Sequence, residues 1–269
     1  MTHPCDVWTA AGYWGRALMT EMYESSNLAQ LVERQWKKWL LLTQQRTQQQ
    51  SLQPLPTVTI SRERGSGGST IGKLLAERLG FVLFDSEIVD HVARSAAVDR
   101  LVVSHMDEHS QRSIKEWTDR LSQNKRFTTQ SYMAHLTKTI LTIGEKGRAV
   151  IIGRGAHLLL PAERCVRVRV IAPLALRTQR LSVGSEMEHS EAAALIAETD
   201  KQRAQFIQEN FQQTDANPLL YDLVINTADI AAEAAAELVV RAVQAKFPHV
   251  LQMHPEGVPD GVNPSRAVV

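Results

Sequence analysis

The chain has 269 residues, of which 43% are hydrophobic and 22% are charged, so it is long enough to bury a sizeable core. Its 30 basic and 29 acidic side chains nearly cancel, and we therefore expect neither nucleic acid nor an anionic membrane as a partner. No apolar run is long enough to span a bilayer, the N-terminus lacks the pattern of a secretory signal, and the two cysteines make no disulfide framework, so a reducing cytoplasm is the expected compartment.

Composition divides the chain into four parts. Residues 1–50 hold four of the five tryptophans and are expected to form a helical N-terminal arm, which a proline-containing linker at 51–56 follows. Residues 57–247 are the expected folded domain. The segment 248–269 is rich in proline and glycine, and we expect a disordered tail there.

The arm carries one apolar face at helical spacing, which includes Trp36 and Trp39. This face either packs on its own domain or associates with a second copy of the chain. We predict that the arm contributes to a homodimer.

Short β-branched runs alternate with helical stretches along the domain. The candidate strands are 57–60, 81–84, 149–152, 166–171 and 222–225. Helices are expected from Ser69 or Thr70 to Arg78, over much of 86–146, and at about 230–246. This alternation predicts a parallel sheet with helices on both faces, in which ligands bind beyond the carboxyl ends of the strands.

The segment between the first strand and the first helix has the layout of a phosphate-binding loop, where backbone N–H groups and a helix N-terminus face an anion. Two registers compete for the pattern G-x-x-x-x-G-K-[ST]. In the first, Gly68 stands in the lysine position and Ser69 supplies the hydroxyl that faces Mg²⁺. In the second, Gly72 and Lys73 fit the pattern, but Leu74 replaces the hydroxyl and the helix is left with about two turns.

We favour the first register, in which Arg62 and Arg64 are the nearest cations to the β- and γ-phosphates. The predicted phosphate-binding residues are Arg62, Gly65, Ser66, Gly67, Gly68, Ser69 and Thr70, with Ser69 also as the metal ligand. Between residues 148 and 180 there are seven arginines, no lysine and one acid. Arginine suits planar contacts to anions, so this stretch indicates an anion site rather than a solvated basic face.

Further motifs follow in a fixed order. They are VTISRERGSGG at 58–68 with IGKLLA at 71–76, FD at 84–85, IGRGAH at 152–157, VRVIAP at 168–173 with Arg177, DKQR at 200–203 and LYDLVINT at 220–227. With these motifs, about 57–240 resembles the cytidylate kinase-like family of P-loop proteins. The resemblance implies a three-layer α/β P-loop kinase-like fold with a five-stranded parallel sheet, and ATP and Mg²⁺ as cofactors. True cytidylate kinases transfer the γ-phosphoryl group of Mg·ATP to CMP or dCMP.

The resemblance also implies roles for individual residues. The acceptor-binding residues would be Asp85, Ser86, Arg154, Asp200 and Arg203. The expected catalytic cations are Arg64, Arg177 and Arg180, the last two of which precede a short lid near 182–189. Two positions depart from the pattern: Gly68 replaces the loop lysine, and Gly155 replaces the acid after the Gly-Arg pair. Both departures bear on ATP-driven catalysis more than on the fold.

Three functions therefore stay open at the level of sequence. The first is a nucleoside monophosphate kinase-like phosphotransferase, which Arg154, Asp200 and Arg203 favour. The second is a nucleotide-binding regulatory module without turnover, which Gly68 favours. The third is an interaction protein that uses the arm. The acceptor is a nucleotide or another phosphate-bearing small molecule.

Other chemical signals receive structural interpretations. His105 and His109 are four residues apart without a third metal ligand at a convincing spacing, so we expect a surface helix. Cys165 is expected in the core. Arg167, in a run that alternates valine with arginine, is assigned a structural role on an edge strand with one solvated face.

Overall fold

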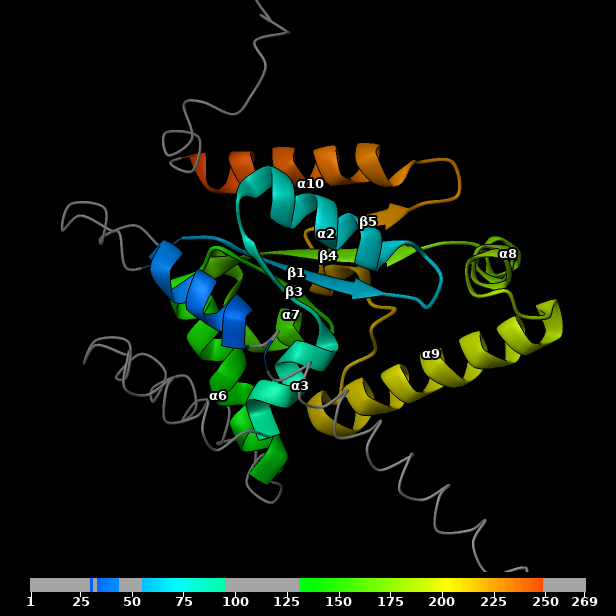
Figure 1. Cartoon of the computed structure of the whole chain (residues 1–269), viewed down its shortest axis with the longest axis horizontal. Helices are drawn as coiled ribbons and strands as arrows, with labels where there is room; N and C mark the ends of the chain where they lie inside the picture. Colours follow the sequence, from blue (N-terminus) through cyan, green and yellow to red (C-terminus); the bar gives the residue numbers. More distant parts are fainter. Residues whose placement is uncertain (1–29, 31–32, 44–54, 95–130, 249–269) are drawn as a thin grey trace, which may run out of the picture.

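The structure is a computed structural model that describes residue 30 and residues 33–43, 55–94 and 131–248. Five parallel strands make one sheet: β1 (Thr57–Arg62), β2 (Val82–Phe84), β3 (Ala149–Ile152), β4 (Cys165–Ile171) and β5 (Leu223–Asn226). Their spatial order is β2-β3-β1-β4-β5, with β1 at the centre (Figure 1). The five predicted strands are confirmed. Because β1 is central, the loop that follows it lies in the middle of the carboxyl edge of the sheet.

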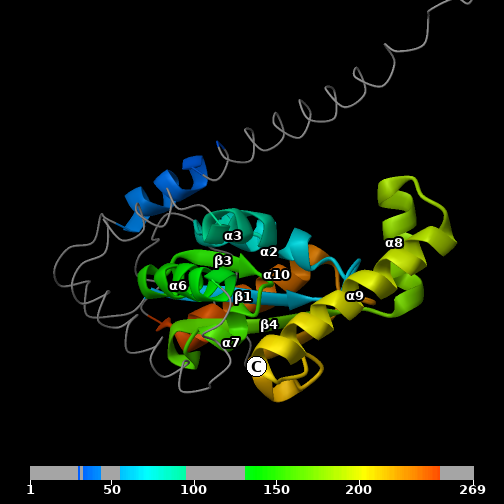
Figure 2. The same cartoon turned by 90° about the horizontal axis from the view of Figure 1, so that it is seen from below.

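Helices cover both faces of this sheet, as predicted. They are α2 (Gly68–Leu79), α3 (Ser86–Arg94), α6 (Ser131–Lys146), α7 (Ala156–Leu159), α8 (Leu174–Ser185), α9 (His189–Phe211) and α10 (Ala232–Lys246), with 3-10 turns at Ala162–Arg164 and Pro218–Leu220. Helices α2 and α10 lie on one face, and α3, α6 and α7 lie on the other (Figures 1 and 2). Helices α8 and α9 extend beyond the end toward which the strands point (Figure 1). Among the described helices, none has the length and apolar character needed to cross a bilayer.

The alternation of side chains along β3 divides the interior into two cores. Ala149 and Ile151 pack toward α3 and α6, whereas Val150 and Ile152 pack toward α2 and α10. All four side chains are buried, as expected for a parallel strand that is covered on both faces.

A short helical segment at 33–43 completes the first of these cores. Trp36 and Trp39 are 1% and 0% exposed, and both rings pack edge-on against Phe84 of β2. The indole Nε1 of Trp39 donates a hydrogen bond to the carbonyl of Gly147 at 2.8 Å. The two tryptophans therefore pack on their own domain, the alternative to self-association, and the homodimer stays a prediction.

Several expectations fall outside the described residues. They concern most of the arm (1–29, 31–32 and 44–50), the linker at 51–54, the tail at 249–269, and His105 and His109.

The expectation of an edge strand at 166–171 is wrong, because β4 lies between β1 and β5. Its two arginines are accommodated by carboxylates: Arg167 pairs with Asp222 at 3.2 Å, and Arg169 pairs with Asp215 at 2.7 Å. The structural role of Arg167 agrees with this pairing. Cys165, at the start of the strand, is fully buried in the core as expected, and burial raises the pKa of its thiol to about 12.

Candidate functional site

The loop after β1 turns directly into α2. Gly65 and Gly67 adopt left-handed φ angles of 80° and 85°, and the amide of Ile71 donates to the carbonyl of Gly67 at 3.0 Å as the first turn closes. The helix therefore begins at Gly68, which the first register requires. Lys73 lies in the second turn of α2 and is exposed, so it is not the cation of this loop.

A cavity of about 330 Å³ opens in front of the loop and of the N-terminus of α2. It is lined by Arg62, Glu63, Arg64, Gly65, Gly67, Gly68, Ser69, Asp85, Ser86, Glu87 and Arg203. We call it the donor cavity. The N–H groups at the start of a helix, together with three arginines, have the chemistry needed to bind an anion.

Two residues of the predicted phosphate loop do not line the donor cavity. Ser66 is fully buried: its hydroxyl donates to the carbonyl of Glu63 at 2.9 Å, and its own carbonyl accepts from the hydroxyl of Thr227 at 2.8 Å. Through these two hydrogen bonds, Ser66 stabilises the conformation of the loop without lining the cavity. Thr70 is exposed on α2 and is absent from the lining.

The donor cavity also offers the oxygen atoms that Mg²⁺ prefers. Ser69 lies in the first turn of α2, and the carboxylates of Asp85 and Glu87 line the same space. Asp85 Oδ1 caps α3 by accepting from the amides of Glu87 and Ile88 at 3.1 and 2.9 Å. A hydroxyl and two carboxylates beside a phosphate loop fit a Mg²⁺ ion that keeps several of its waters.

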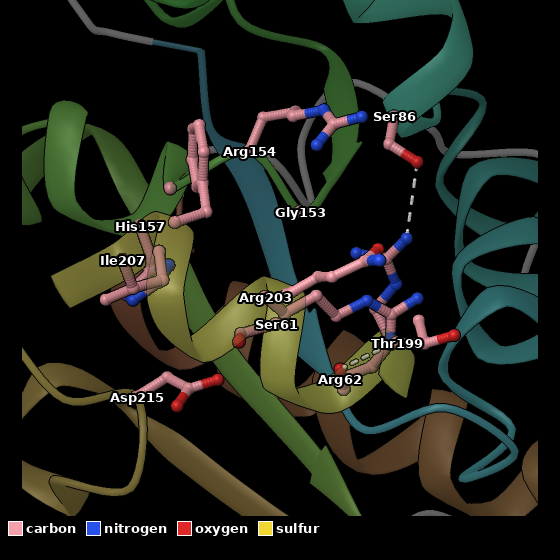
Figure 3. Close-up of a pocket in the computed structure, with 13 residues that line it drawn as sticks. Ser61, Arg62, Ser86, Gly153, Arg154, His157, Thr199, Arg203, Ile207 and Asp215 are labelled. Carbon is pink, nitrogen blue, oxygen red and sulfur yellow. Dashed lines mark hydrogen bonds between the residues drawn. The ribbon is translucent and has the colours of Figure 1, made fainter. Parts of the chain in front are cut away.

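A second cavity, of about 230 Å³, lies between the end of β1, the turn after β3 and α9 (Figure 3). It is lined by Ser61, Arg62, Ser86, Gly153, Arg154, Gly155, His157, Thr199, Gln202, Arg203, Phe206, Ile207 and Asp215. We call it the acceptor cavity. Arg62, Ser86 and Arg203 line both cavities, so the two spaces meet at these three side chains.

Arg154 reaches the acceptor cavity from the turn after β3. Its guanidinium pairs with Asp90 of α3 and lies 5.9 Å from the centre of the Phe206 ring. Its backbone is left-handed (φ 52°), an uncommon conformation for a residue other than glycine, and such strain is often found at functional sites. A Cβ at Gly155, whose φ is 68°, would lie 2.4 Å from Phe211, so this turn has no room for the acid of the family pattern.

Positive charge is concentrated where the cavities meet. Burial and the nearby Arg203 and Arg154 lower the pKa of Arg62 to about 9. Burial is also the main cause of the lowered pKa of Arg203, whose Nη1 donates to the carbonyl of Arg62 at 3.1 Å. Three guanidinium groups therefore share a partly dehydrated space, and an anion between them would relieve their repulsion.

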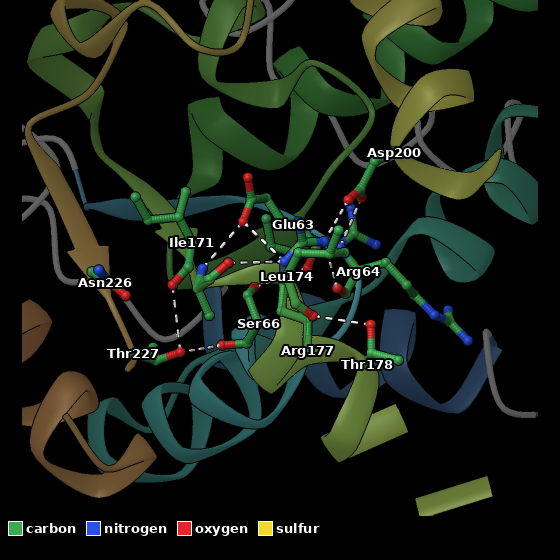
Figure 4. Close-up of polar contacts among 12 residues, drawn as sticks. Glu63, Arg64, Ser66, Ile171, Leu174, Arg177, Thr178, Asp200, Asn226 and Thr227 are labelled. Carbon is green, nitrogen blue, oxygen red and sulfur yellow. Dashed lines mark hydrogen bonds and ion pairs between the residues drawn. The ribbon is translucent and has the colours of Figure 1, made fainter. Parts of the chain in front are cut away.

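The structure places Arg177 and Asp200 differently from the sequence-based expectation (Figure 4). Arg177 is 8% exposed, and its guanidinium donates to Asp200 at 2.7 Å and to the carbonyls of Ala172 and Arg64 at 2.9 and 3.1 Å. It also lies 3.3 Å from Glu63. Its Nε and Nη1 groups are thus engaged by the protein, and its predicted catalytic role stays a prediction.

Asp200 is the other half of this arrangement. Its Oδ1 accepts the amide of Arg64 at 2.8 Å while its Oδ2 accepts Arg177, and it lines neither cavity. In the structure Asp200 ties α9 to the phosphate loop and to α8, and its predicted sugar-binding role stays a prediction. We call Glu63, Arg177 and Asp200 the clamp.

Arg180 is likewise engaged with the protein. Its Nη1 and Nη2 donate to the hydroxyl and the carbonyl of Thr227 at 2.9 and 2.7 Å, and the hydroxyl of Thr227 donates to the carbonyl of Ser66. Arg180 thus fixes the turn after β5 against the phosphate loop. Of the three expected catalytic cations, Arg64 alone lines a cavity.

Several residues of the acceptor cavity were not predicted from the sequence. Phe206 follows Arg203 by three positions, so helical spacing could have placed it on the same face. For His157 and Asp215, no comparable spacing in the sequence predicts that they line this cavity. His157 is buried, stacks on Tyr221 at 4.9 Å, and has its pKa lowered to about 4, mainly by burial and then by Arg169.

Comparisons with known proteins agree with this architecture. A sequence model of the cytidylate kinase-like family matches residues 57–229. A cytidylate kinase of Archaeoglobus fulgidus is 26% identical over 190 residues, which are 70% of this chain and 95% of that enzyme.

Two further matches are more limited. A uronate isomerase of Corynebacterium glutamicum is 29% identical over 121 residues, 45% of this chain, and the chain spans only 23% of that enzyme. The crystal structure of an uncharacterised protein from Eubacterium ventriosum matches with a TM-score of 0.58 at 18% identity, over 72% of this chain and 99% of that one. At this identity the structural match concerns the fold alone.

Proposed function

The chain belongs to the cytidylate kinase-like family, and we propose that it is a phosphotransferase that moves the γ-phosphoryl group of ATP to CMP, dCMP or a related phosphate-bearing acceptor. The observation that carries the proposal is the meeting of two cavities at Arg62, Ser86 and Arg203. One cavity has a phosphate loop at its base, and the other has arginines on its wall. Phosphoryl transfer needs this arrangement, because it depends on positioning and positive charge rather than on covalent work by the protein.

Each cavity has its own task in this proposal. In the donor cavity, the amides of the loop and the N-terminus of α2 hold the β- and γ-phosphates, and Arg64 adds charge at the rim. In the acceptor cavity, Arg154 and Arg203 hold the acceptor phosphate with paired N–H groups. Phe206 provides an aromatic surface beside them. Mg²⁺ bound beside Ser69 would neutralise part of the negative charge on the β- and γ-phosphate oxygens.

The transfer balances without an added acid or base. An ionised oxygen of the acceptor phosphate forms a bond to the γ-phosphorus while the bond from that phosphorus to the β–γ bridging oxygen breaks. The electron pair of the broken bond stays on the β-phosphate, so the products are ADP and the acceptor diphosphate. The arginines at the junction stabilise the charge that spreads over the equatorial oxygens.

Gly68 supports a second candidate function. The cation that the phosphate-loop pattern requires is absent at this position, and a loop without it is expected to bind nucleotide more readily than it turns it over. In that case the protein is a nucleotide-binding regulatory module. Turnover separates the two functions, since both require nucleotide binding.

We would test the proposal with a thermal-shift panel of ATP and nucleoside monophosphates, with and without Mg²⁺, followed by a phosphoryl-transfer assay on the acceptors that bind. Arg154→Ala should weaken monophosphate binding by about 30- to 150-fold, the 2–3 kcal/mol of a buried charged contact, while ATP binding survives. Arg241→Ala, which removes an exposed arginine of α10, is the matched control. Failure of every nucleoside monophosphate to bind at millimolar concentration would show that the acceptor assignment is wrong.

A further inference from the structure

The side chain of Arg62 lies in a slot between two glycines. A Cβ added at Gly68 would lie 2.6 Å from the Cβ of Arg62, and one added at Gly153 would lie 2.2 Å from its Nη1. The first contact involves the root of the side chain and cannot be relieved by a rotamer change. Position 68 therefore has no room for a side chain while Arg62 occupies its present place.

This exclusion concerns the position at which the loop lysine is missing. Because α2 begins at Gly68, the chain register puts the absent lysine at that residue. The space beside it is filled by the aliphatic stem of Arg62, whose guanidinium continues to the junction of the donor and acceptor cavities. The Arg62 side chain can therefore occupy this space only because residue 68 is a glycine.

Arg62 also lacks the carboxylate partners that Arg154 and Arg203 have. Arg154 pairs with Asp90, and Arg203 lies 3.6 Å from Asp200. Within the described residues no carboxylate pairs with Arg62: its Nη2 lies 3.4 Å from the hydroxyl of Ser86, and its buried Nε has no hydrogen-bond partner. Asp85 in the same cavity offsets part of the positive charge, but a largely buried guanidinium with no carboxylate paired to it is costly for the ligand-free protein, and a bound anion would compensate it.

We infer that Arg62 is the cation that replaces the phosphate-loop lysine, reaching the phosphoryl group from the end of β1 instead of from the start of α2. Its place between the cavities allows it to contact both the γ-phosphate of the donor and the phosphate of the acceptor. The inference rests on the proposed function for the identity of these phosphates. On this inference, the glycine at position 68 goes together with the arginine at position 62, and the missing lysine does not by itself indicate that activity has been lost.

The test exchanges the cation between the two positions. The variants are Arg62→Ala, Arg62→Gly, Gly68→Lys and the double variant Arg62→Gly/Gly68→Lys, in which glycine also removes the Cβ that a side chain at position 68 would meet. Lys73→Ala is a control that removes an exposed cation from the same helix. Affinity for ATP and for inorganic tripolyphosphate is measured by calorimetry, kcat and KM by phosphoryl transfer, and the melting temperature without ligand. The tripolyphosphate probe examines the loop whether or not the protein is a kinase.

Arg62→Ala should weaken binding of ATP and tripolyphosphate by about 10- to 150-fold without lowering the melting temperature of the free protein. Gly68→Lys alone should also weaken binding, because its stem competes with Arg62 for one space. The double variant Arg62→Gly/Gly68→Lys should bind at least tenfold more tightly than Arg62→Gly, whereas Lys73→Ala should match the parent.

Three results would overturn the inference: full binding by Arg62→Ala, improved binding by Gly68→Lys alone, or no binding of either probe by the parent protein. Binding that depends on Arg62 without transfer to any acceptor would refute the proposed function and leave the inference standing. The two failures are therefore distinguishable.

Discussion

Replacement of Arg177 by alanine separates a structural clamp from a catalytic arginine. The substitution leaves Asp200 and Glu63 without the guanidinium that lies 2.7 and 3.3 Å from them, and it removes the donors to two carbonyl groups. The Arg177 side chain is only 10% exposed, so water replaces these contacts poorly. Loss of one partner from a buried ion pair costs about 3–5 kcal/mol.

For a domain of this size, each kcal/mol shifts the melting temperature by about 2–4 °C. We therefore expect Arg177→Ala to melt about 6–20 °C below the parent protein in calorimetry. The phosphate loop should lose affinity for ATP as well, because the side chain of Arg177 holds the carbonyl of Arg64 in that loop. Arg177→Lys keeps the positive charge but not the planar guanidinium, so its melting temperature should lie between those of Arg177→Ala and the parent protein.

The opposite pattern would refute this reasoning. If Arg177→Ala melts within about 2 °C of the parent while kcat falls by the roughly 10³- to 10⁵-fold typical of catalytic arginines, Arg177 acts on the phosphoryl group and the clamp is not its main role.

Two further predictions concern stability. Trp39→Ala should lower the free energy of unfolding in urea by about 3–5 kcal/mol, because it empties a fully buried site and frees the Gly147 carbonyl; an unchanged midpoint would mean that the 33–43 segment does not pack on the domain. The predicted homodimer is then best tested by light scattering on a chain that lacks residues 1–29, which keeps both buried tryptophans. Burial lowers the pKa of His157 from 6.5 to about 4, so its neutral form stabilises the fold at pH 7, and this stabilisation is lost as the pH falls from 6.5 to 4, by up to about 3 kcal/mol. His157→Phe should remove that part of the pH dependence in urea titrations, and an unchanged slope would contradict it.

The local sequence pattern was sufficient to predict the five strands of the sheet. The five strands are short β-branched runs bounded by glycine or by a change of periodicity, and a buried parallel strand needs little else to be identified. The same holds for the start of α2, because a helix that began at Lys73 would have been only about two turns long. The position of Arg154 also followed from local sequence, since it comes directly after a strand whose carboxyl end faces the crevice.

The functions of single charged side chains depended on tertiary partners instead. Arg177 and Asp200 are 23 residues apart, and nothing in their spacing shows that they bond to each other across two helices. Both were assigned to ligands because they match motifs of the cytidylate kinase-like family. Once paired in the clamp, their hydrogen-bonding groups are occupied by the protein. The β4 arginines gave the same difficulty, because valine–arginine alternation indicates a solvated edge only when no acids come near from elsewhere in the chain.

The case of position 68 shows why a motif is better compared as a distribution of charge in space than letter by letter. A phosphate loop needs a cation near the transferred group, and the chain position of that cation is secondary. Here a glycine at the motif position and an arginine six residues earlier share one volume, so neither can be judged alone. Gly68→Lys, the substitution that restores the motif, places a second stem in a filled space and a fourth cation beside Arg62, Arg154 and Arg203. On this argument the conventional loop sequence would bind phosphate less tightly in this protein unless the whole side chain of Arg62, including its Cβ, is removed as well.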